Sequence, residues 1–275
     1  MNNKINNNEL YDKLKSVKKY LKIHRSGLME KMLVTLDKNE VPVKDLHETI
    51  ESKSRGKTNE YVAYLEELGI VKLNTSTRSL TPIGVGFKQQ FIEHVNMAYA
   101  IQKHQKYWDE HLLNIPEEFL SRLWVFHDAE LIRNTEYDDA VVINKVRDMA
   151  LNGKYFFGVI SAYSKRYMGI VEEALNKGSI VTMITNDALF EQVSQKDEEK
   201  MRRLLLRNYG RARITRIMSS VNFNKFSMLF TDKEVALFLF KRDGSVEWNE
   251  CLHSENPDAV NAAKELFGFY ERLAM

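Results

Sequence analysis

Apolar residues in the segment 43–81 recur first at helical and then at strand intervals. The spacing predicts a helix, a turn and a second helix, because three or four residues separate successive apolar positions. Pro42 precedes the first helix, Ser54 is a suitable N-cap for the second, and Gly69 supplies its end. Alternating residues at 70–73 and 78–81 then predict two short strands around a polar tip. This order is typical of a winged helix-turn-helix domain.

Basic and polar side chains gather near the start of the second helix and along the hairpin. A helix of this kind fits the major groove of duplex DNA, and a basic hairpin reaches backbone phosphate. The expected DNA-binding residues are Arg55, Lys57 and Asn59 in the groove, with Thr58 and Tyr61 beside them, and Lys72 and Arg78 on phosphate. Two alternatives stay open: a polar face that is only solvated, and a winged helix that binds protein.

Two further helices flank this motif. Leu10, Leu14, Val17 and Leu21 predict a helix whose other side is rich in lysine, either solvated or touching DNA or a partner. After Pro82 a long helix is expected to reach about residue 110, with a coiled-coil-like spacing at Phe87, Phe91, His94, Ala98, Ile101, Gln105 and Trp108. It could join two copies of the chain or pack on its own chain. A homodimer would suit a palindromic DNA site.

Beyond Pro116 the pattern changes to that of an α/β domain. The runs 155–160 and 179–185 are continuously apolar, as strands buried on both faces are, and a helix lies between them. More strands are expected at 129–133, 211–218, 226–230 and 235–240, another helix is expected from Asp197 to Tyr209, and a last helix begins after Asn256. The predicted domains are a winged helix-turn-helix at 1–82, a linker or dimerisation helix at 83–110, and an α/β domain at 111–275.

Composition adds limits to this picture. The 275 residues carry a net charge of +2, but residues 1–82 hold 15 Lys and Arg against 11 Asp and Glu, so positive charge gathers where DNA contact is expected. Cys251 is the single cysteine, which excludes an intramolecular disulfide. No apolar stretch is long enough for a membrane span, and the first residues lack the apolar core of a signal peptide. A cytoplasmic protein without membrane contact is expected.

The order of segments resembles a known family of regulators. LTPIG, a long helix, IPEEFLSRL, AELI, the strand–helix–strand unit, DGS and PDAVNAAKELFGFYERL together resemble the archaeal winged-helix regulators named after the methanogenesis regulatory protein. The resemblance covers the chain from about Ser26. It implies a transcription regulator whose second domain is similar to one half of a phospholipase D-type fold and senses a ligand or mediates assembly.

Catalysis is not expected from this second domain. Phospholipase D chemistry needs a histidine and a lysine two residues apart after a strand, followed by an aspartate. The one such pair, His104 and Lys106, falls in the long helix, where we expect it on the surface, and His111 stands where the aspartate would be. The other histidines lack metal-ligand spacing. We therefore expect no catalytic residue, metal or cofactor.

A small-molecule effector remains possible, because α/β sheets bind ligands beyond the carboxyl ends of their strands. The expected ligand-binding residues at those ends are Ser161, Tyr163, Lys165, Thr185, Asn186 and Asp187. An ordinary role in loops and caps is the alternative for all six. The sequence thus predicts a sequence-specific DNA-binding regulator with a non-catalytic effector or assembly domain; the alternative is an assembly factor that acts through protein contacts.

Overall fold

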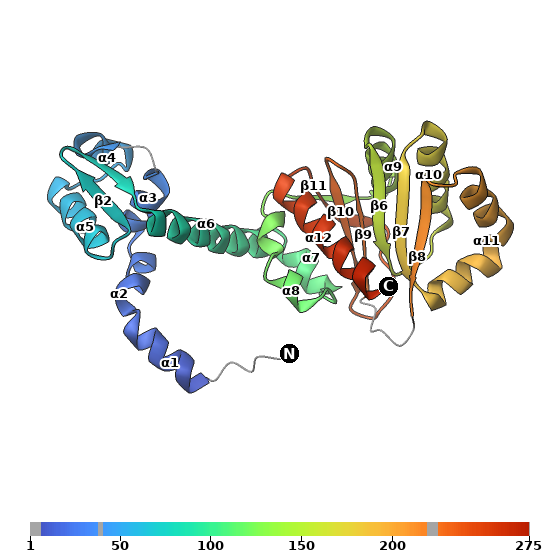
Figure 1. Cartoon of the computed structure of the whole chain (residues 1–275), viewed down its shortest axis with the longest axis horizontal. Coiled ribbons are helices and arrows are strands. Elements are labelled where there is room, and N and C mark those ends of the chain that lie inside the picture. The colour runs from blue at the N-terminus through green and yellow to red at the C-terminus, as the bar shows by residue number, and fades with distance from the viewer. Residues whose placement is uncertain (1–6, 38–40, 219–224, 275) are drawn as a thin grey trace. The chain divides into compact units, whose positions relative to one another are not determined.

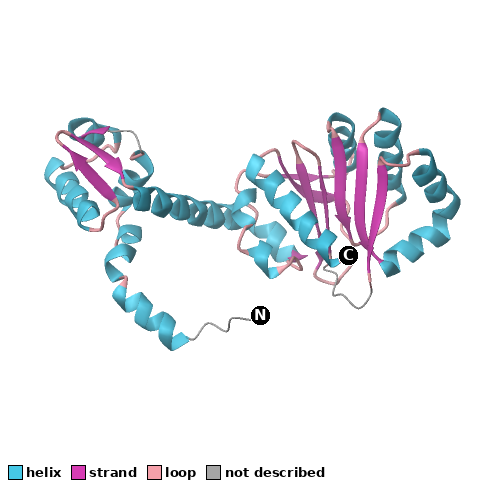
Figure 2. Cartoon of the chain, in the orientation of Figure 1, coloured by secondary structure: helices cyan, strands magenta, loops and turns pink. Residues whose placement is uncertain are grey.

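The computed structural model describes residues 7–37, 41–218 and 225–274. The chain divides into two compact units, Met1–His94 and Val95–Met275, and each is described by itself. Helices, strands and loops are distinguished in Figure 2. Among the described residues, no helix is both long enough and apolar enough to cross a bilayer.

The N-terminal unit is a winged helix-turn-helix. After α1 (Asn7–Ser16), α2 (Lys18–Leu21) and a 3-10 turn (Ile23–Arg25) come α3 (Gly27–Thr35), α4 (Val43–Thr49) and α5 (Arg55–Glu67). Strands β1 (Val41–Pro42), β2 (Val71–Asn74) and β3 (Thr77–Leu80) form an antiparallel sheet in the order β1-β3-β2 (Figure 1). The predicted helix-turn-helix and wing are confirmed.

Local sequence explains why these elements end where they do. The Ser54 hydroxyl accepts a hydrogen bond from the backbone N–H of Lys57 at 3.3 Å, so it caps the start of α5. Gly69 follows α5 with a positive φ of 71°, which glycine adopts without strain. The wing turns more tightly than predicted, because Asn74 and Thr77 already pair and only Thr75 and Ser76 remain between the strands.

One contiguous core holds the three helices and the wing together. It contains Leu46 of α4, Ile50 directly after α4, Val62 and Leu65 of α5, and Leu80 of the wing. The apolar spacing predicted these positions. Val43 was expected on the same apolar face of α4 as Leu46 and Ile50, but its side chain is outside the part of the structure that is described. The N-terminal helix expected through Leu10, Leu14, Val17 and Leu21 is broken at Val17 into α1 and α2, and these four side chains are exposed.

The long helix also differs from its prediction. Helix α6 (Pro82–Lys103) ends at His104, whose φ of −111° and ψ of 23° leave the helical region, and α7 (Gln105–Glu110) follows. Tertiary contacts explain the break. The Tyr107 hydroxyl donates to the carbonyl of Leu237 and accepts from the N–H of Leu239, both at 3.2 Å, and so ties α7 to the sheet.

The C-terminal unit is built on an eight-stranded mixed sheet. Its main path runs β5-β11-β10-β9-β6-β7-β8, and β4 pairs with β10. The strands are β4 (His111–Leu112), β5 (Glu130–Arg133), β6 (Tyr155–Ile160), β7 (Ile180–Asn186), β8 (Ala212–Ile217), β9 (Phe226–Phe230), β10 (Val235–Lys241) and β11 (Glu250–Ser254). Strands β6, β7 and β8 are parallel neighbours, whereas the other pairings are antiparallel.

Helices cover both faces of this sheet (Figure 1). α12 (Pro257–Leu273), with α8 (Glu117–Leu120) and the 3-10 turn Leu123–Phe126, packs on a core that includes Val159, Ile184 and Met228. α9 (Val141–Asn152) and α10 (Lys165–Lys177) pack on the other core, with Phe156, Met183 and Leu229. α11 (Asp187–Arg207) follows β7 directly, so it begins ten residues earlier than the helix expected from Asp197. The predicted α/β class is confirmed.

Candidate nucleic-acid interface and regulatory domain

The N-terminal end of α5 presents exposed basic and polar side chains. Arg55, Lys57 and Asn59 are exposed, and Lys72 of the wing is exposed as well. Tyr61 is half-buried, and the Lys57 ammonium lies 5.8 Å from the centre of its ring. Because the backbone beneath them is fixed by the Ser54 cap and the domain core, these side chains stand on a rigid support.

Thr58 does not belong to this exposed set. Its side chain is 1% exposed, and its hydroxyl lies 2.8 Å from the Ser52 hydroxyl and 3.1 Å from the Ser54 carbonyl. The ring Nδ1 of His47 lies 3.3 Å from the same oxygen. Thr58 therefore ties the turn between α4 and α5 together, and the expected groove contact from this residue is corrected to a structural role.

Arg78 also has a partner within its own domain. Its Nε lies 2.8 Å from Oε1 of Glu66 on α5, and the arginine side chain is 14% exposed. One guanidinium nitrogen donates to the Thr77 carbonyl at 3.1 Å. The structure thus places the guanidinium between the wing and α5, so the expected phosphate contact of Arg78 is revised. Lys72 is the wing cation that stays exposed without such a partner among the described residues.

The basic side of the N-terminal helices is partly engaged too. Lys19 Nζ lies 2.7 Å from Oε1 of Glu67, and Lys22 Nζ lies 4.8 Å from the centre of the Tyr64 ring. Both partners are on the C-terminal half of α5. These two lysines attach α2 to the winged helix, which favours a local role for them over the DNA contact left open by the sequence.

The coiled-coil-like positions of the long helix are used in different ways. Phe91 is buried in the N-terminal core, Phe87 packs against that core, and Trp108 is buried in the C-terminal core. Between them, His94, Ala98, Ile101 and Gln105 are exposed, together with Val95 and Tyr99. The break at His104 separates Gln105 and Trp108 from the straight part of the helix. The stretch that remains available to a partner is therefore confined to the second half of α6.

Three of the six expected ligand-binding residues have roles within the chain, and a fourth is exposed. The Ser161 hydroxyl donates to the carbonyl of Phe226, and its N–H donates to the Ser227 hydroxyl at 3.2 Å. The side-chain oxygen of Asn186 accepts from the N–H of Leu189 at 2.8 Å and so caps α11, whose first residue is Asp187. Lys165 is exposed at the start of α10 and is not part of the wall of the cavity that Tyr163 lines.

Tyr163 and Thr185, in contrast, lie in the wall of one cavity. It has a volume of about 90 Å³ and lies between β6, β7, β8 and β9 of the sheet and helices α10 and α11. Most of its wall is apolar, including Val181 and Met183 of β7. Tyr167 and Trp248, which the sequence did not suggest as site residues, also line it. Strand alternation could have pointed to the β7 residues, but nothing local connects Trp248 with them.

The histidine–lysine pair considered for phosphodiester chemistry is not arranged to act together. His104 is buried, where it was expected on the surface, and burial is the main cause of the lowering of its pKa, to which the nearby Lys103 adds. Lys106 is exposed and pairs with Glu110 at 3.7 Å. His111 is buried and its Nδ1 lies 2.7 Å from the Tyr107 carbonyl.

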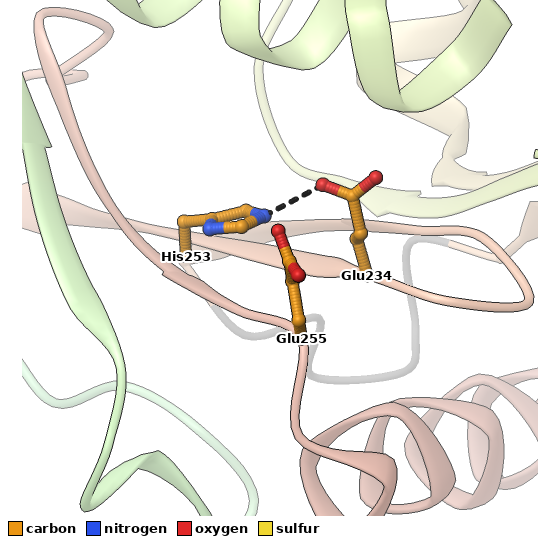
Figure 3. Close-up of side chains that lie close together, drawn as sticks. All are labelled: Glu234, His253 and Glu255. Atoms are coloured by element: carbon orange, nitrogen blue, oxygen red, sulfur yellow. Dashed lines mark hydrogen bonds and ion pairs between the residues drawn. The ribbon is translucent and has the colours of Figure 1, made fainter. Parts of the chain in front are cut away.

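A second cluster joins residues that the sequence keeps apart (Figure 3). Nε2 of His253 on β11 lies 2.9 Å from Oε2 of Glu234, and ligand atoms of these two and Glu255 fall within 4.8 Å of one another. The ammonium of Lys145 on α9 lies 3.0 Å from the same Glu234 oxygen and 3.6 Å from Oε1 of Glu255. Since this cation already pairs with both carboxylates, the cluster fits an internal ion-pair network better than a metal site.

Electrostatics agree with that assignment. Burial raises the pKa of Glu234, but hydrogen bonds from Lys145 and His253 outweigh it and hold the pKa below its ordinary value. The pKa of Lys145 is raised in turn, because Glu234 and Glu255 outweigh the effect of burial. Cys251 lies in the same sheet, and burial raises the pKa of its thiol to about 12, which excludes it as a reactive thiolate.

Comparison with known proteins gives matches among solved structures and to one family model. No curated protein matches the sequence. Among solved structures, TrmBL2, described as an archaeal chromatin protein with a novel mode of DNA binding, has 14% identity and a TM-score of 0.39, covering 90% of this chain and 93% of its own. Nuc, a phospholipase D family member from Salmonella typhimurium, has 11% identity and a TM-score of 0.37, covering 52% of this chain and 91% of its own. At these scores neither likeness carries a functional conclusion.

The family comparison is more direct. The model of the middle domain of the methanogenesis regulatory protein FilR1 matches residues 141–272. These residues include the βαβ unit, the antiparallel strands β9 to β11 and helix α12. The expected resemblance to the methanogenesis regulatory protein family is thereby confirmed over the C-terminal part of this chain, which is similar to the FilR1 middle domain.

Proposed function

We propose that this protein is a sequence-specific DNA-binding transcription regulator whose helix α5 enters the major groove. The observation that carries the proposal is the exposed set Arg55, Lys57 and Asn59 at the capped end of α5, on a winged-helix core. Lys72 on the wing, which is exposed, contacts backbone phosphate in this proposal. The match to a domain of a regulatory protein supports the same function.

The finer parts of the proposal concern the rest of the chain. The second half of α6 joins two copies of the protein, since Val95, Tyr99 and Ile101 are large apolar side chains that stay exposed there. A two-fold dimer would place two copies of α5 on the halves of a palindrome. The C-terminal domain senses a small molecule and performs no catalysis. The separation of His104 from Lys106 supports the absence of phosphodiester chemistry.

The test measures the binding of duplex DNA by the full chain, with fluorescence anisotropy at low salt as the readout. We expect measurable affinity for random duplex, and a loss of at least about tenfold in the double variant Arg55→Ala, Lys57→Ala. Lys264→Ala, which removes an exposed lysine from α12, is the control and should bind as the unaltered chain does. Selection of bound fragments from random DNA should return a palindrome.

Absence of detectable affinity at low salt would contradict the proposal and favour a winged helix that acts through protein contacts. Equal loss in the Lys264→Ala control would show that total charge, and not the end of α5, determines binding.

A further inference from the structure

The cavity on one face of the C-terminal sheet has the composition of a binding site for a small neutral molecule. Alternation along the strands defines its floor. Val181, Met183 and Thr185 of β7 point to one side of the sheet, and Thr182 and Ile184 point to the other. Met183 and Leu229 belong to the core beneath α9 and α10, so the cavity lies on that face. Helix α11 adds Leu189, Phe190 and Leu205 to the wall.

The charges around the cavity argue against an ionic ligand. Among the described residues of its wall, Arg213 is the one with a formal charge, and its guanidinium already lies 3.3 Å from a carboxylate oxygen of Glu271. Lys165, the cation that the sequence suggested for an anionic effector, is exposed and not part of the wall. The guanidinium of Arg216 lies 4.6 Å from the centre of the Phe190 ring but is not part of the wall, so an ion inside the cavity would lose hydration without gaining a partner in the wall.

Two buried oxygens in the wall have no partner among the described residues. The hydroxyl of Tyr167 and the Oγ1 of Thr185 are both inaccessible to solvent and make no hydrogen bond there. Their side chains are 9% and 7% exposed. Leaving a buried polar atom unpaired costs about 1–3 kcal/mol, so native proteins rarely do so without a reason. Both oxygens lie beneath the surface of the cavity wall, so a bound molecule with a hydroxyl or carbonyl group would satisfy one of them after a side-chain shift that exposes it to the cavity.

The size of the cavity restricts the ligand further. At about 90 Å³ it is smaller than the cavities of about 150 Å³ that take up benzene in a small protein. A branched aliphatic group of four or five heavy atoms fits that volume better than an aromatic ring does. Since the cavity is partly open, it would also take the apolar end of a longer molecule.

We propose that this cavity binds a neutral, short-chain aliphatic molecule, or the aliphatic end of a larger one, through a hydroxyl or carbonyl group that meets Tyr167 or Thr185. The inference rests on the proposed function in one respect, because it identifies the chemical class of the effector of the regulator. The binding site itself is defined by the cavity wall alone.

Three probes with the same carbon skeleton test the charge preference: isobutanol, isobutyrate and isobutylammonium. The readout is the NMR signal of ¹³C-labelled methionine methyl groups in the full chain. Met168 and Met183 line the cavity, and Met228 is buried on the opposite face of the sheet as an internal control. Isobutanol should shift the methyl signals of Met168 and Met183 and leave that of Met228 unchanged. The two ions should bind with an affinity at least about tenfold lower.

Variants test the roles of the unpaired oxygens. Thr185→Val keeps the shape of the side chain and removes the hydroxyl, and Tyr167→Phe does the same for the ring. Each variant should leave the ligand-free protein as stable as before or more stable. At least one should reduce the affinity for isobutanol about three- to tenfold. Ala212→Leu fills the cavity from β8 and should abolish the Met183 shift.

Several results would overturn the proposal. These are an absence of shifts at Met168 and Met183 with millimolar isobutanol, equal binding of isobutyrate, or unchanged affinity in both Thr185→Val and Tyr167→Phe. The outcome is separate from that of the DNA experiment. A chain that takes up isobutanol in this way but binds no duplex would contradict the proposed regulator and still support the binding site.

Discussion

The Nε of Arg78 on strand β3 lies 2.8 Å from Oε1 of Glu66 on helix α5, and both side chains are largely shielded from solvent. The pair joins the wing to the helix that is proposed to enter DNA. Because a partly buried charge loses hydration, removal of one partner leaves the other poorly compensated. The position of the wing relative to α5 therefore depends on an interaction within the domain.

Arg78→Ala and Glu66→Gln should each destabilise the N-terminal domain by about 1–3 kcal/mol, between the values typical of exposed and of fully buried pairs. Hydrogen exchange of the buried amides around Ile70 and Leu80 measures the local opening. The control is Lys19→Ala, which breaks the exposed pair with Glu67 and should leave these amides unchanged. A normal exchange rate in Arg78→Ala, with a DNA salt dependence reduced by about one unit of slope, would restore the phosphate role for Arg78.

Lys72 and Asn59 should affect DNA binding in different ways. Lys72→Ala should weaken binding to all DNA sequences to a similar extent, because a phosphate contact releases counterions whatever the sequence. It should also reduce the slope of log affinity against log salt concentration by about one unit. Asn59→Ala should change the preference between sites at a nearly constant slope, because an amide side chain reads base edges. Titrations against selected and random duplexes over a range of salt concentrations distinguish the two. A uniform loss in Asn59→Ala would exclude base reading by this residue.

Self-association should depend on the second half of α6. Ile101 is 50% exposed in the single chain, and a charge at this position would be buried in the proposed dimer. We expect Ile101→Lys to weaken the dimer at least about tenfold, measured by analytical ultracentrifugation. Ile83→Lys is the matched control, since Ile83 is exposed at the start of the same helix and lies outside this stretch. A monomer at all concentrations in the unaltered chain would contradict the dimer.

The Lys145–Glu234–His253 network should make the C-terminal domain less stable in acid. The folded pKa of Glu234 lies below its ordinary value of 4.5, so its contribution is present above pH 4.5 and is lost as the pH falls through the folded pKa. Glu234→Gln should lower the free energy of unfolding by about 1–3 kcal/mol near neutral pH. In this variant the free energy of unfolding should also fall less as the pH is lowered. Urea unfolding followed by the fluorescence of Trp108, Trp124 and Trp248, all in this domain, provides the measurement.

Added zinc supplies a separate check on the same cluster. With the Lys145 ammonium against both carboxylates, zinc should not raise the unfolding temperature of the unaltered chain. A clear stabilisation by zinc that disappears in His253→Ala would show that Glu234, His253 and Glu255 hold a metal after all.

Local sequence determined most of the secondary structure of this protein. The helices α4 and α5, the Ser54 cap, the stop at Gly69 and the wing all follow from side-chain spacing and from the conformational preferences of single residues. The buried strands β6 and β7 were visible for the same reason, since a strand covered on both faces must be apolar throughout. The strand β11 was missed because its Glu250, His253 and Ser254 are polar although buried.

Contacts between distant residues were decided only by the tertiary structure. No local pattern indicates that Arg78 meets Glu66, that Tyr107 ends the long helix by bonding to β10, or that Trp248 and Thr185 line the same cavity. Spacing along the chain reports which face a side chain takes, but not what stands opposite that face. The sequence by itself therefore determined the elements and the exposed end of α5, whereas packing decided which charges stay exposed and where a cavity forms beside the sheet.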